Sequence, residues 1–420
     1  MKSIALLTAG VKQATKRIWE VVSAATLTEV LDLPEFKVSH VDSEDEALHL
    51  KCERKGTVAQ CPRCCELSTE LHQCEDRQVR DLSIGGKRVI LHFSNRRLRC
   101  STCERPFTER LPSIDRRRRQ TRRYERMIYE QCLISDRKAV ARQEQLSEST
   151  VKEIFVKWAK RATRGTFERP VRVLGIDEIS LKKRHKQYAL VLSDLERRCI
   201  LAVLPNRKKK TLVNWLKTLP LDQRQAIKVT SIDLWEPYRQ AVREVLPHAQ
   251  QVADRFHVMK QLNERLTQAR RALQRQADEP TRAFFKGSRW LLVKARNDLS
   301  VEEEAQLQAL LKASPDLRAI YLLKEEFRTI CDRVHDRNQA IRFLRVWIYK
   351  AQLTDNKYLL KFVNTLHNWW DEFLNYFIER ITQGFVEGIN NAIRTIIRRA
   401  YGFRNFDYFR LHVLAKHGST

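Results

Sequence analysis

The sequence predicts a multidomain α+β protein, in which a small cysteine-bearing module and a helical module precede an α/β core interrupted by helices. Three observations support this prediction. Two CxxC pairs lie in the N-terminal quarter, apolar strand-like segments begin at Val171, and residues 260–380 show a helical pattern throughout. A chain of 420 residues has room for several domains.

The chain is strongly basic, with 79 Lys and Arg against 51 Asp and Glu and a net charge of +28. This excess favours a polyanionic partner, most simply nucleic acid, although a solvated basic surface is the alternative. No apolar run approaches the roughly 18–20 residues that a membrane span needs. Lys12, Lys16 and Arg17 interrupt any signal-peptide core within residues 1–26, an N-terminal extension of unassigned function. We therefore expect a cytoplasmic protein.

Residues 27–112 are predicted to form a zinc-ribbon domain. Paired CxxC motifs supply four thiolates for one tetrahedral structural Zn²⁺. The four cysteines of the two pairs are Cys61, Cys64, Cys100 and Cys103. Between the pairs, residues 78–99 have the pattern of a β-hairpin around Gly85 and Gly86. Three other cysteines compete as ligands with less support: Cys52, Cys65 and Cys74. The ribbon either contacts DNA or only braces the next domain.

Residues 113–166 are predicted to contain a basic linker and a helix-turn-helix DNA-binding domain. The linker carries four consecutive arginines that we expect to contact phosphates: Arg116, Arg117, Arg118 and Arg119. The alternative is a solvated linker. In residues 135–162 a short helix, a tight turn and a Ser- or Thr-capped second helix follow one another. The second helix would enter the major groove with Ser149, Thr150 and Lys152 near its start, although a plain helical hairpin would show the same pattern.

Residues 167–259 are predicted to form the first part of the α/β core. Three apolar segments, at 171–180, 187–195 and 198–205, predict consecutive antiparallel strands, after which helices and strands alternate. This is the strand order of the ribonuclease H-like fold, in which acids at the ends of the first and fourth strands lie side by side. Asp177 and Asp233 occupy those two positions.

Residues 381–420 are predicted to complete this core beyond the α-helical insertion at 260–380. The segment 384–400 has helical periodicity, with one apolar face and one polar face. The polar face contains Glu387, Asn390, Asn391, Arg394 and Arg398. An acid followed by amides and arginines suits a metal ligand beside DNA contacts.

Four motifs together, GIDEIS, DLWEPY, ADRFHV and GFVEGINN, resemble those of the ISL3 family of bacterial insertion-sequence transposases, within the DDE superfamily. The resemblance extends from about Leu27 to nearly the end of the chain and includes the ribbon and the helix-turn-helix. It implies that Asp177, Asp233 and Glu387 are the catalytic triad. Residues 1–26 are a departure from the family pattern.

Three carboxylates suit Mg²⁺ or Mn²⁺, with two ions per active site that activate the attacking oxygen and stabilise the leaving 3′ oxygen. Water would first free a 3′-OH at the element's end, and that 3′-OH would then attack target DNA. Asp254 and His257 are expected beside the triad. If Asp233 is not the second catalytic acid, Asp254 is the alternative. The partners are double-stranded DNA, at the terminal inverted repeats and the target, and further copies of the chain. Pairing two element ends requires a homodimer or a higher oligomer.

Two other functions remain open. One is a domesticated, zinc-containing, sequence-specific DNA-binding protein without catalysis. The other is a ribonuclease H-like nuclease or resolvase. Retention of all three acids argues against the first function, and the two DNA-binding modules argue against the second.

Overall fold

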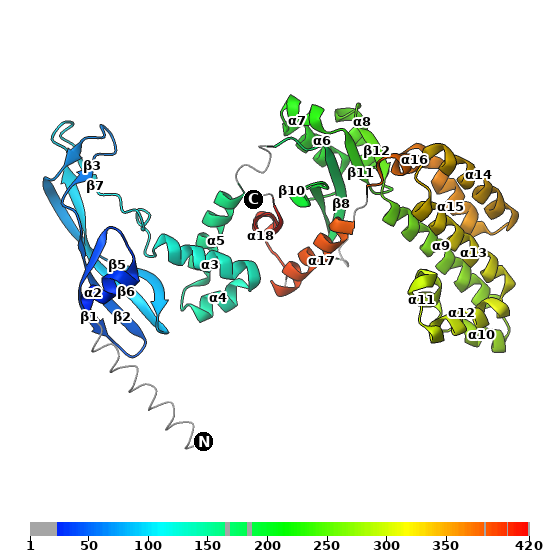
Figure 1. Cartoon of the computed structure of the whole chain (residues 1–420), viewed down its shortest axis with the longest axis horizontal. Helices are drawn as coiled ribbons and strands as arrows, with labels where there is room; N and C mark the ends of the chain where they lie inside the picture. Colours follow the sequence, from blue (N-terminus) through cyan, green and yellow to red (C-terminus); the bar gives the residue numbers. More distant parts are fainter. Residues whose placement is uncertain (1–22, 164–168, 183–186, 382–383, 401, 419–420) are drawn as a thin grey trace, which may run out of the picture. The chain divides into compact units, whose positions relative to one another are not determined.

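The computed structural model describes residues 23–163, 169–182, 187–381, 384–400 and 402–418. The chain forms two compact units, Met1–Trp158 and Ala159–Thr420, which are described separately (Figure 1). Most of the N-terminal extension lies outside the described residues. No helix in the described part of the chain has both the length and the apolar character needed to cross a membrane.

The first unit begins with helix α2 (Ala24–Leu31) and a mixed sheet in the order β1-β2-β6-β5. A further short strand, β7, pairs with the end of β6 at Arg97–Arg99. The strands of this sheet are β1 (Phe36–Ser43), β2 (Ala47–Arg54), β5 (Leu71–Ile84), β6 (Lys87–Arg99) and β7 (Pro106–Thr108). Two short strands, β3 (Ala59–Gln60) and β4 (Leu67–Ser68), form a separate ladder. The predicted hairpin is confirmed, and it is longer than the sequence indicated because β5 starts at Leu71. Gly85 and Gly86 form its turn at φ of 56° and 79°, which glycine adopts without a Cβ penalty.

Two separate cores lie along this hairpin. At one end, α2 and the inner sides of β1, β2, β5 and β6 enclose a cluster that includes Phe36, Leu50 and Leu91. At the other end, Leu98 and Phe107 pack around the cysteines of the ribbon. The ribbon is therefore the far end of a longer sheet, which has a core of its own.

Three helices follow: α3 (Arg122–Ile134), α4 (Arg137–Gln143) and α5 (Glu148–Ala162). The Ser147 hydroxyl caps α5 by accepting a hydrogen bond from the N–H of Thr150 at 3.1 Å. The helix-turn-helix prediction is confirmed. Arg80 of β5 holds this module to the sheet by donating to the Glu144 carbonyl at 2.6 Å.

The second unit contains a five-stranded sheet in the order β10-β9-β8-β11-β12. The first three strands in sequence pair antiparallel, whereas β11 is parallel to both β8 and β12. The strands are β8 (Val173–Lys182), β9 (Gln187–Asp194), β10 (Cys199–Leu204), β11 (Val229–Ile232) and β12 (Gln250–Ala253). This is the predicted meander followed by alternating helices and strands.

Helices cover both faces of this sheet (Figure 1). On one face lie α6 (Lys209–Thr218) and α8 (Glu236–Val245), which pack on Leu174 and Ile176; α7 (Leu221–Ala226) links α6 to β11. On the other face lie α17 (Gly384–Arg399) and α18 (Phe406–His417), which pack on Ile179 and Val191. Strand alternation in β8 thus directs even-numbered residues to α6 and α8, and odd-numbered residues to the opposite face.

The predicted helical insertion separates β12 from α17. It starts at α9 (Arg255–Gln276) and ends with α16 (Trp370–Glu379), which lies beside β12. The intervening helices are α10 (Glu279–Phe285), α11 (Arg289–Val293), the 3-10 helix η2 (Arg296–Asp298), α12 (Val301–Ala313), α13 (Pro315–Arg333), α14 (Arg337–Leu353) and α15 (Lys357–Asn368). Their core, around Phe327, Trp347 and Phe362, continues to Val229 and Val252 of the sheet.

Candidate active site and zinc centre

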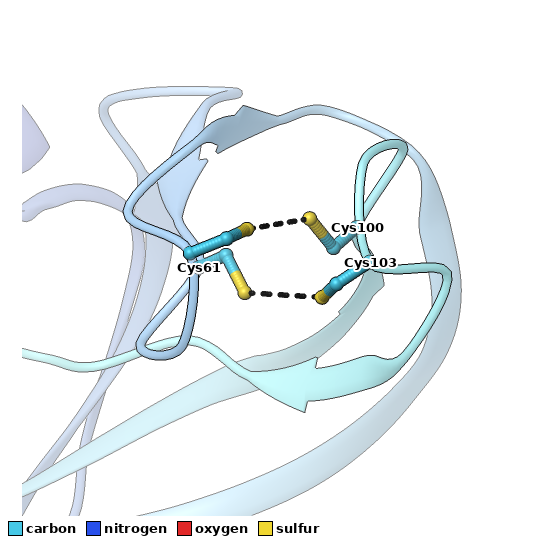
Figure 2. Close-up of side chains that lie close together, drawn as sticks. Cys61, Cys100 and Cys103 are labelled. Carbon is cyan, nitrogen blue, oxygen red and sulfur yellow. Dashed lines mark hydrogen bonds between the residues drawn. The ribbon is translucent and has the colours of Figure 1, made fainter.

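The four cysteines of the two knuckles converge at the end of the β5–β6 hairpin. Their sulfur atoms all lie within 4.8 Å of one another. The sulfur of Cys61 lies 3.8 Å from that of Cys103, and the sulfurs of Cys64 and Cys100 are 3.3 Å apart (Figure 2). Backbone N–H groups of Cys64 and Arg63 lower the pKa of Cys61 to about 6. The pKa of Cys100 is also lowered, chiefly by the backbone N–H of Cys103. Four convergent sulfurs, two of them with a lowered pKa, fit a structural Zn²⁺.

The competing cysteines do not join this group. Cys65 and Cys74 are exposed, and Cys52 is buried in the core at the other end of the hairpin, where burial raises its pKa to about 12. A protonated thiol in an apolar core is a poor metal ligand.

Strand register brings the acids of the second unit together. Ile176 of β8 pairs with Ile232 of β11, which in turn pairs with Ala253 of β12. An aspartate follows each of these three residues in the sequence. Asp177, Asp233 and Asp254 therefore lie in that order across the sheet. Each of the three is at most 8 % exposed.

Asp177 does not end its strand, contrary to the sequence expectation. β8 continues to Lys182 because Glu178 and the residues after it pair with β9. What ends at this level is the neighbouring strand β11. Because β11 ends at Ile232, no residue of β11 pairs with Asp177. The carboxylate of Asp177 can therefore line the pocket.

His257, in the first turn of α9, bridges two of the aspartates. Its Nδ1 lies 2.7 Å from Asp254 Oδ2 and 2.9 Å from Asp233 Oδ1. Only the contact with Asp254 has hydrogen-bond geometry, so Asp233 Oδ1 is buried without a hydrogen bond. Burial opposes the charge on His257, but the two carboxylates prevail and raise its pKa to about 10.

Asn390 of α17 points at Asp177. Its Nδ2 donates to Asp177 Oδ2 at 2.5 Å, and the residue is only 6 % exposed. The predicted contact of Asn390 with DNA stays a prediction, and in this structure its side chain is buried against an aspartate. Burial and the charge of Asp233 together raise the pKa of Asp177 to about 7.

These features fit a divalent cation. Asp177, Asp233 and His257 offer ligand atoms within 4.8 Å of one another. Two buried carboxylates whose ionisation is mutually unfavourable are stabilised by a cation between them.

Glu387 lines the same pocket of about 370 Å³ but does not belong to the close group. It is exposed in the first turn of α17, one turn before Asn390. Arg394 lines the same pocket and Arg398 follows it on α17, and both are exposed, as is Asn391. The polar face of α17 thus runs out of the pocket toward solvent.

A basic residue of the site was not found from the sequence. Arg207 donates to both oxygens of Glu178 at 3.0 Å, and its guanidinium lies over the rings of Tyr188 and Trp235. Glu178 faces α8, opposite to Asp177, and accepts a hydrogen bond from Tyr238 at 3.4 Å. Nothing in the run of cations at 207–210 distinguishes Arg207 from its neighbours, because its contacts are with residues of β8, of β9 and of the segment before α8.

The predicted DNA contacts of the first unit have different surroundings. Ser149, Lys152 and three of the linker arginines, Arg116, Arg117 and Arg119, are exposed, and Thr150 is half-buried. Arg118 instead pairs with Glu125 at 2.6 Å, so its charge is already neutralised within the protein.

Comparisons with known proteins agree with this architecture. Residues 174–413 match a family model for a DDE transposase of type ISL3, residues 109–159 match the helix-turn-helix domain of transposase family ISL3, and residues 57–103 match the zinc finger of the transposases of IS204, IS1001, IS1096 and IS1165. The chain is 32% identical to the transposase for insertion sequence element IS1001 of Bordetella parapertussis, over 90% of this chain and 94% of that protein. It is 26% identical to the transposase for IS1557 of Mycobacterium tuberculosis, over 84% of each chain.

The three family models match the zinc ribbon, the helix-turn-helix and the sheet with its paired aspartates, in that order along the chain. The chain belongs to the ISL3 family of insertion-sequence transposases.

Proposed function

We propose that this transposase binds the terminal inverted repeats of its insertion sequence and carries out metal-dependent cleavage and strand transfer of DNA. The observation that carries the proposal is the pairing of the buried Asp177 and Asp233 in one pocket that Glu387 and Arg394 also line. In this proposal Asp177, Asp233 and Glu387 are the catalytic triad.

The chain's own residues have separate roles in the proposed reaction. Asp177 and Asp233 supply carboxylate oxygens, and Glu387 completes the set from α17. Divalent ions, Mg²⁺ or Mn²⁺, would supply the positive charge that activates the attacking oxygen and offsets charge on the leaving 3′ oxygen. Arg394 and Arg398 hold the flanking phosphates.

Two neighbours would fix the geometry of the ligands. Asn390 orients Asp177 by its hydrogen bond, and His257 ties Asp233 to Asp254. Such partners of metal-binding carboxylates typically contribute about 10–100-fold to metal affinity or activity.

The test uses the full-length protein, Mn²⁺ and a labelled duplex that carries the element's own terminal repeat. Wild-type protein is expected to nick the repeat end only with metal, and Glu387→Gln should lose nicking while it keeps its affinity for the duplex. Glu302→Gln, an exposed change on α12, is the matched control and should nick normally. Wild-type binding without cleavage would favour the non-catalytic DNA-binding function instead.

A further inference from the structure

A groove in the first unit lies mainly on the β-sheet and on the linker before α3, whose first residue, Arg122, also lines it. It has a volume of about 970 Å³ and is lined by β5, β6, β7, the first cysteine knuckle and the segment 110–117. The ribbon and the linker that leads into α3 therefore share one concave surface.

The arginines that line this groove are mostly free of partners. Five of them are exposed and form no ion pair with any residue that the structure describes: Arg63, Arg97, Arg110, Arg116 and Arg117. Some arginines elsewhere in the unit are paired, since Arg54 and Arg96 both pair with Glu109, and Arg123 pairs with Asp81. Arg99 and Arg105 are exposed outside the groove and form no ion pair with any described residue. The groove thus brings five unpaired arginines together on one concave surface.

The acids of the groove do not cancel this charge. Glu109 is buried between its two arginines, and Asp115 contacts Lys157 at 2.5 Å and Arg122 at 2.7 Å. Among the described lining residues, Glu75 is the one carboxylate without a cationic partner. Five free arginines therefore face one free carboxylate.

The form of the groove indicates which polyanion it takes. All five arginines are exposed and come from three chain segments, namely the first knuckle, β6 and residues 110–117, so they do not converge into a desolvated pocket of the kind that holds a small anion. A partner with charges spread along its length suits them better, and duplex DNA carries one phosphate per roughly 1.7 Å of axis. The same unit already contains the helix-turn-helix.

We infer that this groove binds the sugar–phosphate backbone of duplex DNA beside the segment read by α5. The inference rests on the proposed function, because it assumes that DNA is the partner. It gives the ribbon a direct role in binding and not only a bracing role. Phosphate contacts position a protein on DNA without reading sequence, so the groove should contribute equally on any duplex.

The test measures the salt dependence of DNA affinity by fluorescence anisotropy, with the full-length protein. The probes are a duplex carrying the terminal repeat and a duplex of unrelated sequence. Arg63→Ala combined with Arg97→Ala should reduce the slope of log K against log salt by about 2 on both duplexes, because each lost phosphate contact removes about 0.9. Arg105→Ala, an exposed ribbon arginine outside the groove, should leave the slope unchanged.

Zinc content reports whether the ribbon is intact in these variants. If the double variant loses zinc, Arg110→Ala combined with Arg116→Ala tests the opposite wall and should lower the slope by the same amount. Wild-type slopes in the zinc-retaining double variant, on both duplexes, would overturn the inference.

A converse substitution checks the sign of the effect. Glu75→Gln removes the free carboxylate of the groove and should tighten binding to both duplexes. Glu70→Gln makes the same change of net charge on an exposed residue outside the groove and should have a smaller effect. Equal effects of the two would count against a groove. If the wild-type protein bound both duplexes equally well and the groove variants still lowered the salt slope as expected, the result would contradict the proposed function but not the inference about the groove.

Discussion

Neighbouring residues of α17 have different environments. A helix advances about 100° per residue, so Asn390 lies about 60° from Glu387 and borders the apolar face, whereas Asn391 lies closer to the centre of the polar face. The structure buries Asn390 against Asp177 and exposes Asn391. Helical periodicity placed both on one broad polar face, and the packing of the helix on the sheet separated them.

Asn390→Ala should therefore impair the metal site and leave DNA binding intact. The change removes the donor that orients Asp177, and we expect the affinity for Mn²⁺ to fall by about 10–100-fold, measured by calorimetry without DNA. Asn391→Ala is the matched control, with unchanged Mn²⁺ affinity. An Asn390→Ala protein that binds Mn²⁺ as wild type does would show that the hydrogen bond is not needed for the site.

At the scale of elements, α17 connects the core to the pocket. Its buried side, with Ile389 and Ile393, packs on the sheet beside Phe409 and Val413 of α18. Its exposed side carries Glu387 and Arg394. Packing of the first side fixes the position of the second, so under the proposed function stability and activity would depend on adjacent residues of this helix.

Ile393→Ala and Arg394→Ala should separate these two properties. Ile393 is fully buried, and its truncation should lower the free energy of unfolding of the second unit by about 2–5 kcal/mol. Arg394 is exposed, and its truncation should change stability by less than about 0.5 kcal/mol while it weakens DNA binding and lowers the salt slope by about 1. Urea titrations and anisotropy measure the two effects. A stable Ile393→Ala protein would mean that α17 is not anchored by this contact.

At the scale of the whole molecule, the chain forms two units, and the hydrophobic clusters of the ribbon, the sheets and the insertion each lie within one of them. The ribbon and sheet clusters draw on residues of the first unit alone, and the three clusters around the catalytic sheet and the insertion draw on the second alone. Loss of the metal of one unit should therefore not unfold the other.

Cys103→Ser tests this separation. The variant should lose its zinc, because three thiolates remain, and its first unit should unfold at lower temperature and bind DNA more weakly. The thermal transition of the second unit and its affinity for Mn²⁺ should stay as in the wild type. Cys65→Ser, an exposed cysteine next to the knuckle, should retain stoichiometric zinc. Loss of zinc in both variants would mean that the ligand set includes Cys65.

The sequence by itself determined the order of the modules, the hairpin between the cysteine pairs, the strand order of the core and the pairing of Asp177 with Asp233. These features depend on local periodicity, on turn residues and on motifs, which are properties of short segments. Only the tertiary structure decided that Asn390 faces Asp177, that Arg118 is neutralised by Glu125, and that Arg207 joins Glu178. It also brought five unpaired arginines of the ribbon and the linker into one groove. Such contacts join residues far apart in sequence, and which charges are paired depends on packing that no single segment specifies.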